Sequence, residues 1–522
     1  MRNRIWALLA ILLWVAACAR MVSGLDDTYY EEVTPKSGVT QASILFSNNI
    51  NGETQPCGCN KFPLGGLEQT AGHFHQVQSK MPVIYVDSGD LFFPSPILPA
   101  NVLTSHRFTA EKLVEAMHHL ELKFYVPGDQ DFALGTDWLA DLSKKAKFTF
   151  LLANVRAENP FKSKKWARVS VGEKKLVFIG VLDPELLQAQ QAALFSSPEV
   201  AIEASLKEAD PSDDEMVVLL SHSGMDRDRR YAQLFPRLNW IIGAHTQSFT
   251  QRPIEEGGTQ IVQVLSRNHY IGQIEFGVGK KDKQTKFGLL ETREEFAKVV
   301  EPNPLAPLMQ SWRTGVADAQ AKEQALSAGS MATKDPLPTF NSCLECHQKQ
   351  TAFWQGTAHA NAWHTLAAKG SDNDASCVGC HSVGWQSPQG FMSTPQRVRF
   401  EGVHDATKLA AYTKDLAANY AGVKSVRALS AAQRKQKAQG QMKLITKHNV
   451  SHDFGNVQCL NCHDKTRDHP FDGSLQYAGG DMTAKCVQCH TADQSPDWYK
   501  DGQPNKAVVA QRMKAVACPS GK

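Results

Sequence analysis

Short apolar runs recur along residues 42–300, and stretches with helical periodicity separate several of them. The apolar runs are predicted to be strands at Ser43–Phe46, Val83–Val86, Phe124–Val126, Phe150–Ala153, Leu176–Val181, Val217–Leu220 and Trp240–Ile242. Helices are predicted over Ala110–Leu120 and Thr136–Ser143. Strands that alternate with helices indicate an α/β fold in which the helices lie outside the sheet.

Polar clusters follow directly after five of these strands, where open α/β sheets bind their ligands. They are SNNING (47–52), DSGD (87–90), GDQD (128–131), SHSG (221–224) and GAHTQ (243–247). In this order the clusters resemble the calcineurin-like phosphoesterase domain of bacterial 5′-nucleotidases. The resemblance implies a metallophosphatase-like α/β sandwich over residues 42–300, with mixed sheets flanked by helices. It also implies a two-metal site for phosphate ester hydrolysis.

Only some of the metal-ligand positions that the resemblance implies hold a suitable ligand in this chain. Metal-ligand positions are kept at Asp90, Asp129, His222 and His245. Asn49, Asn51 and Gln247 replace other ligands, and Gln130 replaces the catalytic histidine. Neutral amides supply no charge for a second divalent cation, so we expect one divalent metal or none. Alternatively, these polar residues only cap loops and helix N-termini.

The strongest chemical signal is a CxxCH pattern that occurs four times after residue 340. The motifs are Cys343/Cys346/His347, Cys377/Cys380/His381, Cys459/Cys462/His463 and Cys486/Cys489/His490. CxxCH is the attachment signature of c-type haem, in which the two thiols form thioethers and the histidine binds the iron. Zinc sites also use CxxC pairs, but they do not require a histidine directly after each pair. The pattern predicts four c-type haems.

The stretches CLECHQKQTAFWQGTAHANAWHTL, CVGCHSVGW, VQCLNCHDKTRDH and CVQCHTADQSPDW resemble multihaem cytochromes of the c-554 type over most of residues 340–500. The resemblance implies a mostly helical, loop-rich domain, with His359 and His469 as distal iron ligands and His452 as a third choice. The less favoured ligands are His364, His404 and His448, with Met392, Met442 and Met482 as competitors. Bis-histidine iron suits electron transfer. The stretch 405–447 reads as a helical insertion, which leaves the fourth distal ligand open.

Three cysteines remain when the haem thiols and Cys18 are set aside, since the chain has twelve. Cys57 and Cys59 lie in a CxC arrangement just after the first polar cluster. A disulfide between residues two apart is strained, so metal binding or a redox role is one interpretation. The other is pairing with a distant cysteine such as Cys518.

The N-terminal residues predict export. Arg2 and Arg4 precede a 13-residue apolar run, Ile5–Ala17, which is shorter than the roughly 20 residues that cross a bilayer. The stretch VAAC (15–18) resembles a bacterial lipobox, which implies a lipoprotein signal peptide over 1–18 and acyl chains on Cys18. With Ala19 next, the resemblance favours an outer-membrane lipoprotein that faces the periplasm or the cell surface. An ordinary signal peptide is the alternative.

Composition and domain order complete the prediction. Lys+Arg 56 against Asp+Glu 53 is too balanced to indicate nucleic-acid binding. Prolines bound a helical linker, 301–337, between the α/β domain and a tetrahaem domain over 338–522. We expect an electron carrier that uses other cytochromes or quinol-linked donors as redox partners. In this view the α/β domain serves for docking or sensing, and no catalytic residue is assigned. A redox-linked metallohydrolase or a multihaem reductase is the alternative.

Overall fold

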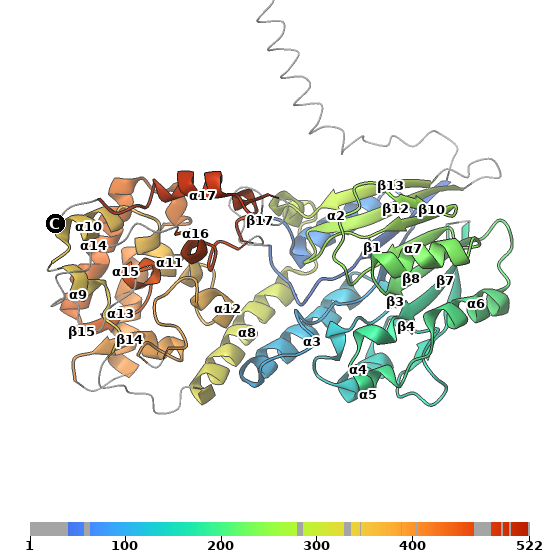
Figure 1. Cartoon of the computed structure of the whole chain (residues 1–522), viewed down its shortest axis with the longest axis horizontal. Coiled ribbons are helices and arrows are strands. Elements are labelled where there is room, and N and C mark those ends of the chain that lie inside the picture. The colour runs from blue at the N-terminus through green and yellow to red at the C-terminus, as the bar shows by residue number, and fades with distance from the viewer. Residues whose placement is uncertain are drawn as a thin grey trace, which may run out of the picture. The chain divides into compact units, whose positions relative to one another are not determined.

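The computed structural model describes residues 40–56, 63–172, 174–278, 285–327, 336–344, 346–387, 389–402, 406–463, 482–491, 494–500 and 503–519. Several predicted positions lie outside these residues: the leader with Cys18, the Cys57/Cys59 pair, His404 and His469. The chain divides into two units, and the part of the second unit from Gln310 onward is coloured from yellow to red in Figure 1. The first unit contains the described parts of Met1–Pro56, Pro63–Ile97 and Ala110–Met309, and the second those of Leu98–Thr109 and Gln310–Lys522. Among the described helices, none combines the length and apolar character needed to cross a bilayer.

Two mixed sheets form the first unit. In spatial order, one contains β13 (Thr285–Glu291), β12 (Tyr270–Val278), β1 (Thr40–Ser47), β2 (Val83–Asp87), β3 (Leu122–Tyr125), β4 (Thr149–Leu151) and β5 (Ser163–Lys164). The other contains β10 (Ile254–Glu256), β11 (Thr259–Val262), β9 (Trp240–Gly243), β8 (Met216–His222), β7 (Lys174–Leu182) and β6 (Trp166–Val171). Strands β1 to β5 run parallel, as do β7, β8, β9 and β11, while β6, β10, β12 and β13 join antiparallel. The predicted α/β class with mixed sheets is confirmed.

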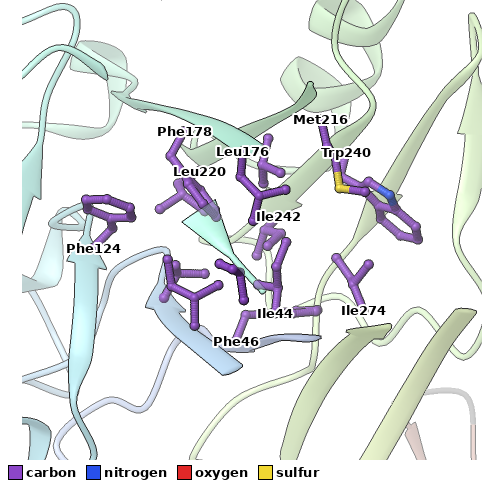
Figure 2. Packing of buried hydrophobic residues seen from close by; sticks show 14 of the residues in the cluster. Ile44, Phe46, Phe124, Leu176, Phe178, Met216, Leu220, Trp240, Ile242 and Ile274 are labelled. Atoms are coloured by element: carbon purple, nitrogen blue, oxygen red, sulfur yellow. The ribbon is translucent and has the colours of Figure 1, made fainter. Parts of the chain in front are cut away.

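The core of the first unit lies between the two sheets. Ile44, Phe46 and Phe124 from one sheet pack against Phe178 and Leu220 from the other, and Figure 2 shows these side chains meeting. Successive strand residues point to opposite faces, so alternate residues of each strand enter this layer. Burial of such large apolar side chains from both sheets is the main term that holds the sheets together.

Helices cover the outer faces of both sheets, as α/β architecture requires. They are α2 (Leu67–Gln78), α3 (Leu103–His119), α4 (Thr136–Lys145), α5 (Ala189–Ala192), α6 (Pro198–Ala209) and α7 (Met225–Leu234). Tyr85 of β2 contacts Phe74 of α2 and Met117 of α3 on one outer face. On the other, Ile202 of α6 and Tyr231 of α7 join a buried cluster with β7 to β9 and β11.

The second unit consists mainly of short helices and connecting loops (Figure 1). Its helices are α8 (Ala306–Ser327, with Gln310 onward in this unit), α9 (Phe340–Leu344), α10 (Gln348–Trp354), α11 (Ala362–Ala367), α12 (Ala375–Val378), α13 (Ala406–Asn419), α14 (Ala431–Lys447), α15 (Cys459–Cys462), α16 (Thr483–Cys486) and α17 (Lys506–Met513). Its strands are β14 (Val398–Phe400), β15 (Val450–Asp453), β16 (Tyr499–Lys500) and β17 (Gln503–Pro504). The stretch 405–447 thus contains two helices, α13 and α14, and α8 lies in the predicted linker.

A buried ion pair connects these insertion helices to the antiparallel pair of β14 and β15. Arg397 donates to the carboxylate of Asp453, and both side chains are almost fully buried. Asp453 also accepts hydrogen bonds from Tyr412 of α13, at 2.6 Å, and from Gln441 of α14, at 2.9 Å. These hydrogen bonds compensate the carboxylate for the water that it loses on burial.

Replacement of Phe178 by Ala should lower the free energy of unfolding of the first unit by about 3–5 kcal/mol, because it leaves a cavity between the sheets. Denaturant titration followed by circular dichroism measures this change. Val200→Ala is the control, since that side chain is 65% exposed and should change stability by less than about 0.5 kcal/mol. Equal effects of the two substitutions would contradict this location of the core.

Candidate metal centre and haem-attachment sites

The four retained metal-ligand positions come together at the carboxyl ends of strands from both sheets. Asp90 follows β2, Asp129 follows β3, His222 ends β8 and His245 follows β9. Each side chain offers one ligand atom, and these four atoms all lie within 4.8 Å of one another. Parallel strands end at the same edge of their sheet, which is why residues so far apart in sequence converge.

Hydrogen bonds set the orientation of the two imidazoles. His222 donates from Nδ1 to the carbonyl oxygen of Ser88 at 2.8 Å, which leaves Nε2 to bind a metal. That Nε2 atom lies 3.1 Å from Asp129 Oδ1 and 3.5 Å from Asp90 Oδ1. His245 Nδ1 lies 3.0 Å from the same Asp129 oxygen. Two carboxylates and two imidazoles therefore face a common point.

The electrostatics of the cluster favour a positive charge at that point. Burial raises the pKa of Asp90 to about 7, against the opposing effect of a charged His222. Burial would also raise the pKa of Asp129, but hydrogen bonds from His222 and His245 hold it well below its usual range. For His222 burial lowers the pKa, yet the negative charges of Asp90 and Asp129 outweigh this effect and raise it to about 9.

The loops that carry these ligands are strained and closely packed. Asp90 and His245 have φ of 55° and 71°, a left-handed conformation that is uncommon outside glycine and that clusters at functional sites. Gly128 permits the close approach of the two loops around the cluster. A Cβ atom at Gly128 would lie 2.2 Å from Asp90 Oδ1 and 2.4 Å from the His222 ring.

Two of the four amides singled out in the sequence, Gln130 and Asn49, make hydrogen bonds within the site. Gln130 donates to Asp90 from its backbone N–H at 3.0 Å and from Nε2 at 2.7 Å. Asn49 accepts from the His245 backbone N–H at 3.1 Å and donates to the Leu265 carbonyl at 3.2 Å. The side-chain oxygen of Asn51 is buried without a hydrogen-bond partner, and Gln247 is exposed. Asn49 and Gln130 thus add amide dipoles, and no charge, to the site.

Asp131 connects two loops of the site, and it was not among the residues predicted from the sequence. Asp131 is fully buried and accepts hydrogen bonds from Tyr125 Oη at 2.5 Å and from the N–H groups of Gly128 and Phe92, both at 2.8 Å. It therefore joins the loop of Asp90 to the loop of Asp129. Its position two residues after Asp129 in the GDQD cluster was the available signal.

Each haem-attachment motif of the second unit begins at a helix of one turn: α9, α12, α15 or α16. His381 donates from Nδ1 to the Ala362 carbonyl oxygen at 2.8 Å, and His490 Nδ1 lies 3.0 Å from Ser495 Oγ. Both contacts leave Nε2 available for iron, as in metal sites where an outer partner orients the imidazole. The His490 ring also stacks on Trp498, with ring centres 4.2 Å apart.

The first and third motifs are less enclosed than the CxxCH pattern predicts for residues that hold an iron. Cys346 and His347 are both exposed, and His463 is half-buried. The backbone N–H groups of His347 and His463 donate to the carbonyl oxygens of Cys343 and Cys459, both at 2.9 Å, so each histidine directly follows its helical turn. Helices this short supply few atoms to cover a side chain. A porphyrin bonded to the thiols would supply that cover, and the haem roles of Cys346, His347 and His463 stay predictions from the motif.

Of the predicted distal ligands, His359 has the clearest geometry. Its ring centre lies 6.3 Å from that of His490. A metal–imidazole bond is about 2 Å long, so an iron bonded to one nitrogen of each ring would hold the ring centres about 6 Å apart. The observed separation of the ring centres matches this value, and the role of His359 as a distal ligand stays a prediction.

Two of the less favoured histidines contact other protein groups through Nε2, the nitrogen that would bind iron. His448 Nε2 lies 2.8 Å from Asp415 Oδ2, and His364 Nε2 contacts the Val423 carbonyl oxygen at 3.1 Å. His452, on β15, is half-buried with Nδ1 3.2 Å from Ser451 Oγ. The Met442 sulfur contacts Gln355 Nε2 at 2.7 Å.

Sulfur atoms of different motifs lie next to one another. The Cys343 thiol contacts that of Cys459, and the Cys380 thiol contacts that of Cys489. In a chain with haem attached at these motifs, the same sulfur atoms would be thioethers. The first motif is thus a neighbour of the third, and the second motif is a neighbour of the fourth.

Comparison with known proteins matches the two parts of the chain separately. Residues 342–405 match the family model described as cytochrome c554 and c-prime. A 92-residue segment is 29% identical to cytochrome c-554 of Nitrosomonas europaea and covers 15% of this chain and 39% of that protein. A 236-residue segment is 22% identical to the 5′-nucleotidase of Bos taurus and covers 41% of this chain and 39% of that protein.

The chain joins a 5′-nucleotidase-like unit to a cytochrome c-554-like region. It spans about two fifths of the length of the curated relatives that it matches. The solved 5′-nucleotidase precursor from Thermus thermophilus superposes with a TM-score of 0.44 at 21% identity, over 53% of this chain and 59% of that one. A putative 5′-nucleotidase from Staphylococcus aureus gives 0.47 at 13% identity, over 80% and 99%. The cytochrome match implies bound haem and redox partners.

In chelator-treated protein, the stability of the nucleotidase-like unit should fall as pH rises from 6.5 to about 9. The folded pKa of His222, about 9, lies above its ordinary value of 6.5. Stabilisation by the charged imidazole is therefore complete below pH 6.5 and is lost as pH rises through 9. Urea unfolding at pH 6.5, 8 and 9.5 should show this loss, of a few kcal/mol. His222→Gln should make the slope shallower, while the part due to Asp87, whose pKa burial raises to about 8, should remain.

His73→Gln provides the control for this pH dependence. Burial lowers the pKa of His73 to about 4, so its contribution changes only below pH 6.5. The slope between pH 6.5 and 9.5 should then match that of the unmodified protein. An unchanged slope in His222→Gln would contradict the assignment of the pH dependence to the metal-site imidazole.

Proposed function

We propose that this protein is an exported, lipid-anchored cytochrome that carries electrons through four covalently attached haems. Its nucleotidase-like unit holds one divalent metal and serves for docking or substrate sensing. The observation that carries the proposal is the fourfold CxxCH pattern, together with imidazoles that are already oriented for iron at His381 and His490. The export signal and Cys18 lipidation rest on the N-terminal sequence alone.

Each haem would be held by the two cysteines and the histidine of its motif. When bound, a c-type haem supplies an iron that cycles between the ferrous and ferric states, and bis-histidine ligation suits it to electron transfer. His359 would be the distal ligand of the fourth haem, opposite His490, while His452 and His469 remain the candidates for other haems. The contacts Cys343–Cys459 and Cys380–Cys489 support two pairs of neighbouring haems, the first with the third and the second with the fourth, as short electron-transfer steps require.

The nucleotidase-like unit would hold its metal through Asp90, Asp129, His222 and His245. Two carboxylates balance the charge of one divalent cation, and the mixed nitrogen and oxygen ligands suit zinc, iron or manganese. Gln130 occupies the position of the catalytic histidine, and Asn49 and Asn51 add no charge for a second cation. Hydrolysis of phosphate esters by a metal pair needs both ions, so we propose that this unit is not a phosphoesterase.

A redox-linked metallohydrolase is the second candidate function, and the intact four-ligand cluster is the observation that favours it. A multihaem reductase would instead require an iron that is open to substrate. Three distal ligands are proposed for four haems, so one iron without a distal ligand would be the open iron of such a reductase. Other cytochromes or quinol-linked donors would be the redox partners of either form.

Protein matured in a host that attaches haem should contain four haem irons per chain by metal analysis and by its cytochrome absorption bands. His359→Ala should add one five-coordinate iron, because it removes one axial ligand, and carbon monoxide binding to the reduced protein should rise by one equivalent. The matched control is His448→Ala, since His448 is already bonded to Asp415. Zinc in place of iron, or equal carbon monoxide binding in both variants, would contradict the proposal.

The chain should also bind one manganese or zinc ion outside the haems and show no metal-dependent phosphatase activity. Gly128→Ala should weaken this binding about 10–100-fold, because the new methyl group displaces Asp90 and His222. Gly288→Ala should leave binding unchanged, since no atom lies within 4 Å of the added carbon. Equilibrium dialysis measures the affinity, and robust phosphatase turnover with manganese would favour the metallohydrolase.

A further inference from the structure

A cavity of about 200 Å³ lies in the second unit, between α11 and the insertion helices α13 and α14. Trp363, Leu409, Leu416 and Tyr420 form much of its wall. None of the cysteines and histidines of the four CxxCH motifs, all of which the structure describes, lines it. The cavity is therefore separate from the haem-attachment residues, and the insertion 405–447 builds one side of it.

Arg397, one of the residues that line the cavity, has an unused hydrogen-bond donor. Arg397 lines the cavity, is only 4% exposed and stacks on Trp363, with its guanidinium carbon 4.4 Å from the ring centre. Its Nη1 donates to Asp453, whereas its Nε is buried without a partner. A buried donor without a partner costs about 1–3 kcal/mol, so a ligand that supplies an acceptor would relieve a real penalty.

The charges around the cavity indicate a neutral ligand. Asp453 is fully buried and neutralises the charge of Arg397. The free Nε can therefore donate a hydrogen bond without adding net positive charge to the cavity. Asp372 also lines the cavity, and its negative charge disfavours an anion. Two further polar groups in the wall are already bonded, since His364 Nε2 contacts the Val423 carbonyl and Tyr420 donates to Asn361.

The size and walls of the cavity indicate a single planar ring. An apolar cavity of about 150 Å³ holds benzene, so this one can hold one substituted ring. We propose that it binds a quinone-type ring, with one carbonyl oxygen accepting from Arg397 Nε and the ring between Trp363 and Leu416. The choice of a redox-active ring over other neutral carbonyl compounds rests on the proposed electron-transfer function.

Equilibrium dialysis of the oxidised, haem-loaded full chain against duroquinone tests this site. Duroquinone is a neutral single ring with two carbonyl oxygens, and one molecule should bind per chain. Durene, the same ring without oxygen atoms, should bind at least tenfold more weakly, because it cannot satisfy Arg397. Benzoate should also bind at least tenfold more weakly, because its charge is unfavourable beside Asp372. Equal or tighter binding of either comparison compound would overturn the ligand class.

Two neighbouring alanines of α13 offer matched substitutions, one inside the cavity wall and one outside it. Ala417 lines the cavity and Ala418 does not, although both are exposed. Ala417→Trp should weaken duroquinone binding at least tenfold, and Ala418→Trp should leave it unchanged. Arg397→Gln should weaken binding too, but it also breaks the pair with Asp453, so the alanine variants decide the question. No binding by the unmodified chain, or equal binding by both alanine variants, would overturn the site.

The haem content of the same samples separates this proposal from the proposed function. Ala417→Trp should keep the haem absorption bands and iron content of the unmodified protein. Bound duroquinone in protein that lacks covalent haem would remove the electron-transfer function and leave the cavity assignment standing. A full complement of haems without duroquinone binding would remove the cavity assignment alone.

Discussion

The contact between the two mixed sheets is the constraint on which the metal centre depends. Asp90 and Asp129 belong to one sheet, while His222 and His245 belong to the other, so no single sheet contains the four ligands. Their convergence requires the buried layer around Phe46, Phe178 and Leu220 to hold the sheets face to face. A change in that packing would separate carboxylates from imidazoles before it altered any individual loop.

Burial of charge then decides what the centre can do. Asp90, Asp129 and His222 are buried away from water, and the pKa values of Asp90 and His222 have moved because of that burial and of their neighbours. A divalent cation would replace the proton that His222 and the carboxylates hold between them. The substitutions at Asn49 and Gln130 preserve hydrogen bonds around one cation position while they withdraw charge from a second. This arrangement favours a unit that keeps a metal but not the two-metal chemistry.

The second unit meets a different constraint, because its chemistry-bearing residues lie on or next to helices of a single turn. Such helices have almost no stability by themselves. They are held by tertiary contacts, among them the bond from His381 to Ala362 and the stack of His490 on Trp498. The Arg397–Asp453 pair holds the insertion helices in the same unit. Because Arg397 Nε has no hydrogen-bond partner, this structural ion pair also offers a candidate contact to a ligand.

The sequence by itself was enough for the features that depend on neighbouring residues. The CxxCH motifs are local, and the seven predicted strands correspond to β1, β2, β3, β4, β7, β8 and β9, since apolar runs of that length are themselves the signal. The predicted helix from Ala110 in fact begins at Leu103. Strands β5, β6 and β10 to β13 of the first unit were not predicted, because polar residues and glycines interrupt their apolar positions. Family resemblance, rather than periodicity, supplied the metal ligands.

Only the tertiary structure decided which partners those residues meet. The Ser88 carbonyl that orients His222 has no signature in the sequence, because every residue has a carbonyl group. Asp131 connects the loops that carry Asp90 and Asp129, and His448 is bonded to Asp415. The rings of His359 and His490 lie close together although 131 positions separate them in the sequence. Hydrogen bonds and ring contacts of this kind depend on the path of the backbone between distant residues, and residue spacing alone does not specify that path.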